Sequence, residues 1–263
     1  MFYQQLLFIE NFIQLIRKCN QVILEIYSQD FNVIMKKNNS PLTIADQKVN
    51  EIIVSYIKKL NLDLELETNE IFTIISEESK NESFEKRKDA TFAWLIDPID
   101  GTKEFIKKNG QFTVNIGLAQ DKKPVFGIVS IPVTGEIYYG IRGVGSYKID
   151  KESTKLKVNI PKNLMKKNIR IVASLSHQNQ ETKDFIITHV APLLITIGSS
   201  IKLLYIAENK ADIYPRYAPT SEWDTCAAHA VVKYAGGLVL DVHTRKELQY
   251  NKENLLNPYF VVY

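Results

Sequence analysis

The chain of 263 residues has few of the residues that build disulfide or thiolate scaffolds, since it contains two cysteines and four histidines. Cys19 and Cys226 stand far apart in the sequence, which argues against a disulfide framework or a zinc knuckle. We expect both to be reduced thiols in the core of a cytoplasmic protein. The segment G-x-x-x-x-G-K-[ST] does not occur, which excludes a P-loop.

Internal repeats and low-complexity tracts are also missing, and no uninterrupted apolar run is long enough to anchor the chain. The first 27 residues are apolar, but polar side chains recur among them at helical spacing and no basic segment precedes them. We therefore predict an amphipathic helix from about Tyr3 to Tyr27 that packs on the core, and no membrane span.

Neither sign of charge dominates, because 33 lysines and arginines stand against 30 acidic residues and leave a net charge of +3. The lysines occur as scattered pairs, a pattern typical of solvated faces, so we expect no nucleic-acid partner. A small basic excess helps an anionic substrate to approach without selecting one. With 45% hydrophobic residues, the chain can bury a large core, and its oligomeric state stays open between monomer and dimer.

The order of the expected elements changes near residue 150. Residues 1–150 show two helices followed by several strands, with a second helix over residues 47–60, which predicts an α+β half. Residues 151–263 alternate strands and helices and predict an α/β half. One helix of this half, expected over residues 222–235, carries a run of alanines that would allow a close approach to another element.

The stretch Trp94–Phe105 reads W-L-I-D-P-I-D-G-T-K-E-F and organises the rest of the chain. It begins as an apolar strand, which Pro98 is expected to end. Gly101 permits a tight turn, and Thr102 can begin a helix.

Two carboxylates, Asp97 and Asp100, flank that proline. Carboxylate oxygens suit Mg²⁺, and the free amides at a helix start suit phosphate. Asp-Pro and Asp-Gly pairs are also ordinary turn formers, so this stretch alone leaves a plain turn open.

Other acidic residues have structural alternatives. Asp46 is expected at the N-cap of the second helix, and Asp224 lies in the first turn of a later one, where it complements the helix dipole. Glu77 and Glu78 follow an apolar strand, so they can form a solvated turn, yet that strand would bring Glu77 to the same sheet edge as Asp97. Residues 80–89 are polar and predict an exposed, mobile loop.

Four blocks in this order resemble the inositol monophosphatase superfamily of metal-dependent phosphatases. The blocks are Leu42–Asp46, Ser76–Ser79, Trp94–Thr102 and Trp223–Gly237. Three further stretches resemble its 3′(2′),5′-bisphosphate nucleotidase branch, of the CysQ type. These are Gly101–Ile116, Gly198–Lys202 and Ala211–Arg216. The resemblance implies a layered αβαβα sandwich of the sugar-phosphatase type, with the site between the two halves.

The resemblance also implies a role for each matched acidic residue. Two or three Mg²⁺ ions would be bound by four side chains and one backbone carbonyl: Glu77, Asp97, Asp100, Asp224 and the carbonyl of Ile99. Thr102 and Asp46 would orient and help to deprotonate the attacking water, and Glu78 would support the ligands from behind. The amides of Gly101 and Thr102 would hold the phosphate.

Substrate selection is implied for the second half of the chain. Ser199, Lys202 and Arg216 would lie near the nucleotide and its second phosphate, although a lysine on a helix and an arginine in a loop are common surface residues. One departure from the branch pattern is Leu175, which replaces an arginine. His177 keeps the pattern, and either contacts substrate or is an ordinary loop histidine.

The resemblance implies Mg²⁺-dependent removal of the 3′-phosphate from adenosine 3′,5′-bisphosphate, with inhibition by Li⁺ and a place in sulfur metabolism. An inositol monophosphatase or another sugar-phosphate phosphatase is the nearest alternative, because it uses the same chemistry in a different pocket. A family member that binds RNA or protein without catalysis is a further alternative. The presence of every acidic ligand argues against it.

Overall fold

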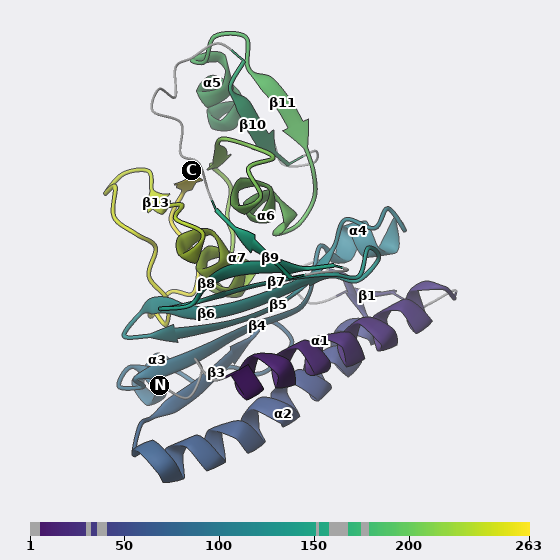
Figure 1. Ribbon diagram of the computed structural model, residues 1–263, viewed down its shortest axis with the longest axis vertical. Helices are drawn as coiled ribbons and strands as arrows, with labels where there is room; N and C mark the ends of the chain where they lie inside the picture. Colours follow the sequence, from purple (N-terminus) through teal and green to yellow (C-terminus); the bar gives the residue numbers. More distant parts are fainter. Residues whose placement is uncertain (1–5, 30–32, 36–40, 151–152, 158–167, 175–178) are drawn as a thin grey trace.

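A computed structural model of the chain describes residues 6–29, 33–35, 41–150, 153–157, 168–174 and 179–263. Its helices and strands stack in alternating layers, with the seven-stranded sheet between two helical layers and the shorter strands of the second half of the chain beyond them (Figure 1). The expected αβαβα sandwich is therefore confirmed.

The described helices are α1 (Leu6–Tyr27), α2 (Ile44–Thr68), α3 (Phe84–Arg87), α4 (Thr102–Ile106), α5 (Gln180–Ile187), α6 (Ile201–Ala207) and α7 (Glu222–Tyr234). The strands of the large sheet, in spatial order, are β3 (Phe72–Ser76), β4 (Phe92–Asp100), β5 (Thr113–Gln120), β6 (Lys123–Ile131), β7 (Glu136–Ile141), β8 (Gly145–Ile149) and β9 (Ser153–Leu156). The remaining strands are β1 (Val33–Met35), β2 (Pro41–Thr43), β10 (Arg170–Ala173), β11 (Leu193–Thr196), β12 (Tyr214–Arg216), β13 (Val239–Asp241) and β14 (Phe260–Val262).

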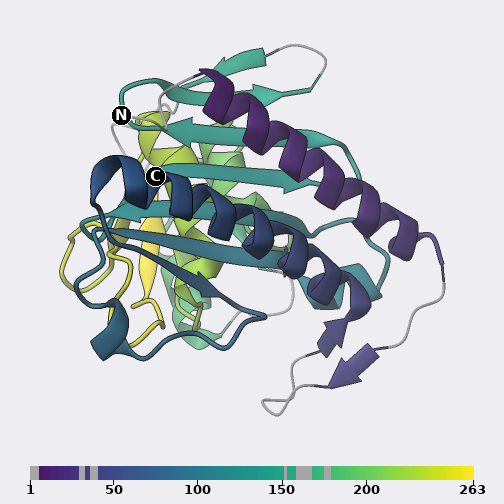
Figure 2. The same ribbon diagram turned by 90° about the horizontal axis from the view of Figure 1, so that it is seen from below.

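The large sheet separates two helical layers. Helices α1 and α2 lie side by side across one face, as the view from below shows (Figure 2), while α6 and α7 cover the other face. Beyond α6 and α7, the β10–β11 pair and the β12–β14–β13 sheet are joined by a parallel bridge between Ile171 and Ile213. Since β9 belongs to the large sheet, the first layers continue past residue 150, and the division of the chain there stays a prediction.

Strand β4 is buried on both faces, which explains its unbroken apolar sequence. Trp94 points to the α1–α2 side, where its ring stacks on Phe12 with centroids 5.4 Å apart. Its Nε1 donates a hydrogen bond to Asn61 Oδ1 at 2.9 Å. Leu95 points the other way, into the core beneath α7. The strand is thereby fixed from both sides.

Helix α7 lies directly on the backbone of the large sheet. Gly117, Gly127 and Gly140 pair side by side on β5, β6 and β7 and face this helix. A Cβ atom on Gly127 would lie 2.1 Å from the carbonyl oxygen of Ala227, and one on Gly140 would lie 2.5 Å from that of Ala230. The predicted close approach of the alanine-rich helix is confirmed, and the row of glycines makes it possible.

Two sequence expectations near the central strand are wrong. Strand β4 does not end before Pro98 but continues to Asp100, because the register against β5 shifts between Asp97 and Asp100. A proline inside such a bulge removes no regular ladder hydrogen bond. Residues 80–89 are not a plain loop either: they contain α3, and Arg87 at its end is buried.

Both cysteines are buried free thiols, as expected. Among the helices in the described ranges, none combines the length and the apolarity that crossing a bilayer requires.

We predict that Gly127→Ala lowers the free energy of unfolding by about 3 kcal/mol or more, the upper end of the usual cost of overpacking. The added methyl group would push against the backbone of α7 rather than against a flexible side chain. Urea unfolding of both proteins measures the difference.

Gly135→Ala is the matched control, because a Cβ atom there meets nothing within 4 Å and only the left-handed φ of +74° opposes it. We expect the control to cost about 1 kcal/mol. Equal costs for the two variants would contradict the close packing of α7 on the sheet.

Candidate metal and phosphate site

Two parallel strands bring the first two acidic residues together. Strands β3 and β4 pair with Ser76 opposite Ile96, so the residues that follow them emerge at the same edge of the sheet. The amide of Glu77 donates to the carbonyl oxygen of Ile96 at 3.1 Å, one residue before Asp97. The expectation that β3 brings Glu77 to the same edge of the sheet as Asp97 is confirmed.

Asp224 joins them from the first turn of α7. Its Oδ2 accepts a hydrogen bond from the amide of Ser221 at 2.8 Å, in a capping box at the start of the helix. Glu77, Asp97 and Asp224 each offer a carboxylate oxygen, and these oxygens lie within 4.8 Å of one another. The expected place of Asp224 in the first turn of a helix is confirmed, and its capping contact holds the carboxylate in the cluster at the same time.

The electrostatics of this cluster are unfavourable without a cation. Asp97 is 1% exposed, and burial raises its pKa well above the ordinary range, with Glu77 and Asp100 raising it further. Burial also raises the pKa of Asp224, and the charge of Asp100 adds to it. Every donor atom is an oxygen, and oxygen-only sites suit hard divalent cations such as Mg²⁺. The residues present therefore fit a metal of this kind.

Asp100 lines the same cavity but points toward the start of α6. Its Oδ2 accepts hydrogen bonds from Ser199 Oγ at 2.7 Å and from the amide of Ser200 at 2.5 Å. It is not one of the three residues whose oxygens meet within 4.8 Å. Asp100 thus connects the sheet edge to the second half of the chain, and Ser199 lies at that connection.

Thr102 and Asp46 face each other at the entrance to α4. Thr102 Oγ1 lies 3.4 Å from Asp46 Oδ1 and 3.2 Å from the carbonyl oxygen of Ile99. The single hydroxyl proton of Thr102 therefore has two possible acceptors. Asp46 Oδ2 accepts from the amide of Thr43 at 2.8 Å. The N-cap expectation for Asp46 is wrong, since α2 already begins at Ile44 and Asp46 lies in its first turn. That position leaves one oxygen of Asp46 directed at Thr102.

A cavity of about 320 Å³ opens beside these residues. Of the predicted site residues, it is lined by Glu77, Asp97, Ile99, Asp100, Gly101, Thr102, Ser199, Lys202, Arg216 and Asp224. Asp46 lies behind Thr102, and Glu78 does not line the cavity; the backbone carbonyl of Glu78 accepts from Asn50 Nδ2 at 3.5 Å. Leu175 and His177 fall outside the described residues.

The two predicted cations, Lys202 and Arg216, also line the cavity. Lys202 is 5% exposed, so the surface alternative for it is wrong. Its Nζ donates to the carbonyl oxygen of Ser199 at 2.5 Å, and burial lowers the pKa of Lys202 to about 8. Arg216 extends from β12 and donates through Nη2 to the carbonyl oxygen of Pro219 at 3.0 Å. Both groups remain beside the cavity.

Sequence reasoning missed several lining residues, among them Glu104, Tyr214, Thr220, Thr225 and Phe260. Strand periodicity could have found Tyr214, because it stands two residues before Arg216 on the same strand and therefore on the same face. Glu104 belongs to the short helix that follows the central strand. No local pattern points to Phe260.

A model of the inositol monophosphatase family matches residues 4–259. The 3′(2′),5′-bisphosphate nucleotidase CysQ of Escherichia coli (strain K12) is 36% identical over 255 residues, which cover 95% of this chain and 96% of the relative. The crystal structure of CysQ from Bacteroides thetaiotaomicron matches with a TM-score of 0.79 and 39% identity over 94% of this chain and 93% of that one. An inositol monophosphatase of Thermotoga maritima, 21% identical over 97% of this chain and 91% of that one, has the same fold with a TM-score of 0.75.

These matches extend over nearly the whole chain and agree with the carboxylate cluster, whose oxygen donors fit a divalent cation. The chain therefore belongs to the inositol monophosphatase family of metal-dependent phosphatases.

Proposed function

We propose that the chain is a Mg²⁺-dependent 3′(2′),5′-bisphosphate nucleotidase that removes the 3′-phosphate of adenosine 3′,5′-bisphosphate and releases AMP. The observation that carries this proposal is that one cavity is lined both by a carboxylate cluster and by two cationic side chains, Lys202 and Arg216. CysQ relatives that cover 95% of the chain support the same reaction. As a phosphatase, the chain hydrolyses a phosphoric monoester.

Glu77, Asp97 and Asp224 would hold Mg²⁺, with Asp100 and the carbonyl of Ile99 as the further ligands that the family resemblance implies. When bound, the ion neutralises charge on the phosphoryl group and makes water a stronger acid. The repulsion among the clustered carboxylates favours uptake of a cation, since neighbouring acidic groups add to the burial that raises the pKa of Asp97 and of Asp224.

Thr102 and Asp46 prepare the water for attack. A water molecule that donates to Thr102 Oγ1 would be oriented by it, because the threonine proton can be directed at Asp46 Oδ1, 3.4 Å away. As the water oxygen bonds to phosphorus, the bond from phosphorus to the 3′-oxygen breaks and the released 3′-oxygen takes a proton from solvent. The proton of the attacking water would pass to Thr102 Oγ1 while the threonine proton passes to Asp46. Asp46 is 1% exposed, so this transfer is shielded from bulk solvent.

The phosphate to be removed would be held by the backbone at the start of α4. Gly101 has a left-handed φ of +95°, and a Cβ atom there would lie 3.1 Å from the carbonyl oxygen of Gln111. A glycine therefore brings the backbone amides of Gly101 and Thr102 close to the cavity without strain. Amides donate to phosphate oxygens without adding a competing charge.

The second phosphate would be recognised by Lys202 and Arg216, which line the same cavity together with Ser199. A lysine supplies a point charge, and an arginine supplies a planar fork that fits two phosphate oxygens. These cations favour a bisphosphate over inositol 1-phosphate, which has a single phosphate group. Where relatives of this branch carry the arginine that Leu175 replaces, either another cation substitutes or the selectivity for the nucleotide is looser.

The two buried free cysteines support a reducing compartment such as the cytoplasm. A purely RNA- or protein-binding role is disfavoured, because such a role would not require three carboxylates held together against their mutual repulsion.

We expect phosphate release to be fastest from adenosine 3′,5′-bisphosphate when the enzyme is assayed with Mg²⁺ beside inositol 1-phosphate and fructose 1,6-bisphosphate. The reason is that Lys202 and Arg216 can bind the second phosphate of the nucleotide. A preference for inositol 1-phosphate would keep the chemistry and reject the nucleotide pocket. No release from any of the three would reject the proposed reaction itself.

We predict that Lys202→Met raises KM for adenosine 3′,5′-bisphosphate about tenfold or more, the usual loss when a hydrogen bond to a charged group is removed. KM for adenosine 3′-phosphate, which lacks the second phosphate, should change little. Because the pKa of Lys202 is lowered to about 8, its charge is lost as pH rises through that value. The wild-type KM for the bisphosphate should therefore increase above pH 8, and the variant should lack this increase.

Lys210→Met serves as the control for this comparison, because Lys210 is exposed and pairs with Glu208 outside the cavity. Equal changes in KM for both nucleotides in Lys202→Met would show that Lys202 does not bind the second phosphate.

A further inference from the structure

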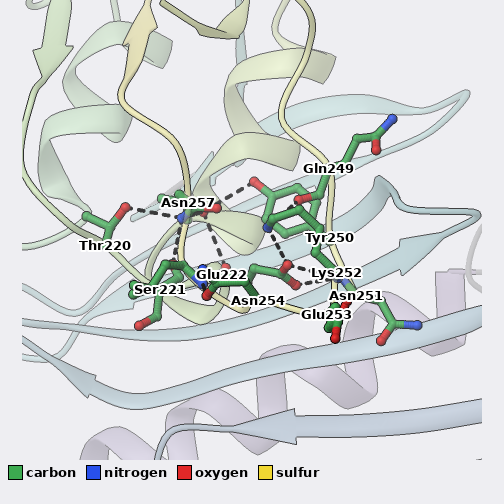
Figure 3. A network of polar contacts seen from close by, with 12 residues as sticks. Thr220, Ser221, Glu222, Gln249, Tyr250, Asn251, Lys252, Glu253, Asn254 and Asn257 are labelled. Atoms are coloured by element: carbon green, nitrogen blue, oxygen red, sulfur yellow. Dashed lines mark hydrogen bonds and ion pairs between the residues drawn. The ribbon is translucent and has the colours of Figure 1, made fainter. Parts of the chain in front are cut away.

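The segment formed by residues 249–257 lies across the start of α7 (Figure 3). The amide of Glu222 donates to the carbonyl oxygen of Leu255 at 2.9 Å, and the amide of Asn257 donates to that of Thr220 at 2.8 Å. Ser221 and Leu256 form an antiparallel bridge between these contacts. The segment therefore pairs with the residues that lead into the helix carrying Asp224.

Asn257 makes the side-chain contacts at one end of this pairing. Its Nδ2 lies 2.7 Å from the carbonyl oxygen of Ser221, 3.0 Å from Thr225 Oγ1 and 3.1 Å from Thr220 Oγ1 (Figure 3). A carbonyl can only accept, so the contact to Ser221 fixes which end of the amide is the donor. Ser221 and Thr225 stand on either side of Asp224 in the sequence.

The oxygen of the Asn257 amide, Oδ1, makes no comparable contact among the residues that the structure describes. The side chain is 8% exposed, and its Oδ1 is buried without a hydrogen-bond partner in the parts of the chain that the structure describes. Leaving a buried acceptor unpaired costs stability. If Asn257 only stabilised the fold, the cost of its unpaired Oδ1 would count against an asparagine here. The cost is acceptable if the role of Asn257 is to donate hydrogen bonds through Nδ2.

The carboxylate of Glu222 holds the same segment at residues 251 and 252. Glu222 is fully buried, and its carboxylate accepts from the amides of Asn251 at 2.5 Å and Lys252 at 3.0 Å and pairs with Lys252 Nζ. Arg87 Nη1 in turn donates to Asn251 Oδ1 at 2.7 Å. The segment is thus fixed against α3 as well as α7, and Asn257 acts from a rigid support.

We propose that Asn257 is a positioning residue that orients the Asp224 carboxylate for cation binding. Asn257 holds the carbonyl of Ser221, and the amide of Ser221 donates to Asp224 Oδ2 at 2.8 Å. This contact holds a carboxylate that offers an oxygen within 4.8 Å of oxygens of Glu77 and Asp97. The inference rests on the proposed function, because it assumes that this cluster binds Mg²⁺.

The test compares Asn257→Asp and Asn257→Leu with the control Asn254→Asp. Both asparagines belong to the same segment, but Asn254 is exposed and its Oδ1 accepts from the amide of Leu256, a contact that an aspartate keeps. The Mg²⁺ dissociation constant of the metal-free protein is measured by calorimetry. The Mg²⁺ concentration for half-maximal activity and KM for the bisphosphate are measured separately.

We expect both Asn257 variants to weaken Mg²⁺ binding about ten- to hundredfold, the usual effect of losing a residue that orients a metal ligand. The half-maximal Mg²⁺ concentration should rise in parallel, with KM for the nucleotide at saturating Mg²⁺ changed less than about twofold. Asn254→Asp should match the wild type. In Asn257→Asp the added negative charge would by itself strengthen cation binding, so weaker binding there reports lost orientation.

Unchanged Mg²⁺ binding in the folded variants would overturn the proposal. Unfolding of both Asn257 variants, detected by circular dichroism, would assign the residue to stability and overturn it as well. The calorimetry uses Mg²⁺ alone, so it remains decisive if the nucleotide proves not to be the substrate. An absence of Mg²⁺ binding by the wild type would instead contradict the proposed function.

Discussion

The repulsion among the clustered carboxylates at the edge of the large sheet is the constraint on which the site depends. Glu77 and Asp97 are brought together by the parallel pairing of β3 and β4, and Asp224 is added by α7. Burial strengthens the repulsion because it removes the water that would screen the charges. Holding these groups together therefore lowers the stability of the metal-free fold, and a bound cation would offset this cost.

The packing of α7 shows what opposes that repulsion. The row of glycines on β5, β6 and β7 lets the backbone of α7 contact the sheet directly. Any displacement of α7 toward the sheet would therefore cause steric clashes between backbone atoms. On the opposite face, the ring of Trp94 fixes β4 against α1. Both elements that deliver carboxylates are consequently rigid, which is what a site with defined ligand geometry requires.

The central strand, the helix after it and most element types could be predicted from sequence because they depend on local signals. Apolar runs bounded by Asp, Gly and Pro specify where strands stop, and the resemblance to a known family added the order of the layers. The expectation that Pro98 ends the strand was wrong because a proline is compatible with β4 only at the register shift against β5. No local sequence pattern reveals that pairing. The start of α2 was placed too late, since Thr43 and Asp46 share the capping contacts.

Other features could not be predicted because they arise only from tertiary packing. Three glycines in separate strands become a row only when the register is known, and Lys202 becomes a buried cation only when α6 packs beside the cavity. The polar contacts between Asn257 and the start of α7 join residues more than 30 positions apart. Sequence reasoning recovered the chemistry of the site better than the supports that hold it.

The most direct test of the repulsion is the free energy of unfolding of the metal-free wild type and of Asp97→Asn, measured by urea denaturation across pH. Asparagine keeps an oxygen to accept from the amide of Ile99, as Asp97 Oδ1 does at 3.0 Å, but removes the charge. Folding raises the pKa of Asp97, so the metal-free wild type should lose stability relative to the variant as pH rises above about 4, the ordinary carboxyl range.

Saturating Mg²⁺ should then stabilise the wild type far more than Asp97→Asn and remove the advantage of the variant at neutral pH. This result would show that the cluster is strained without a cation and relieved by one. A difference between the two proteins that changes neither with pH nor with Mg²⁺ would contradict the account.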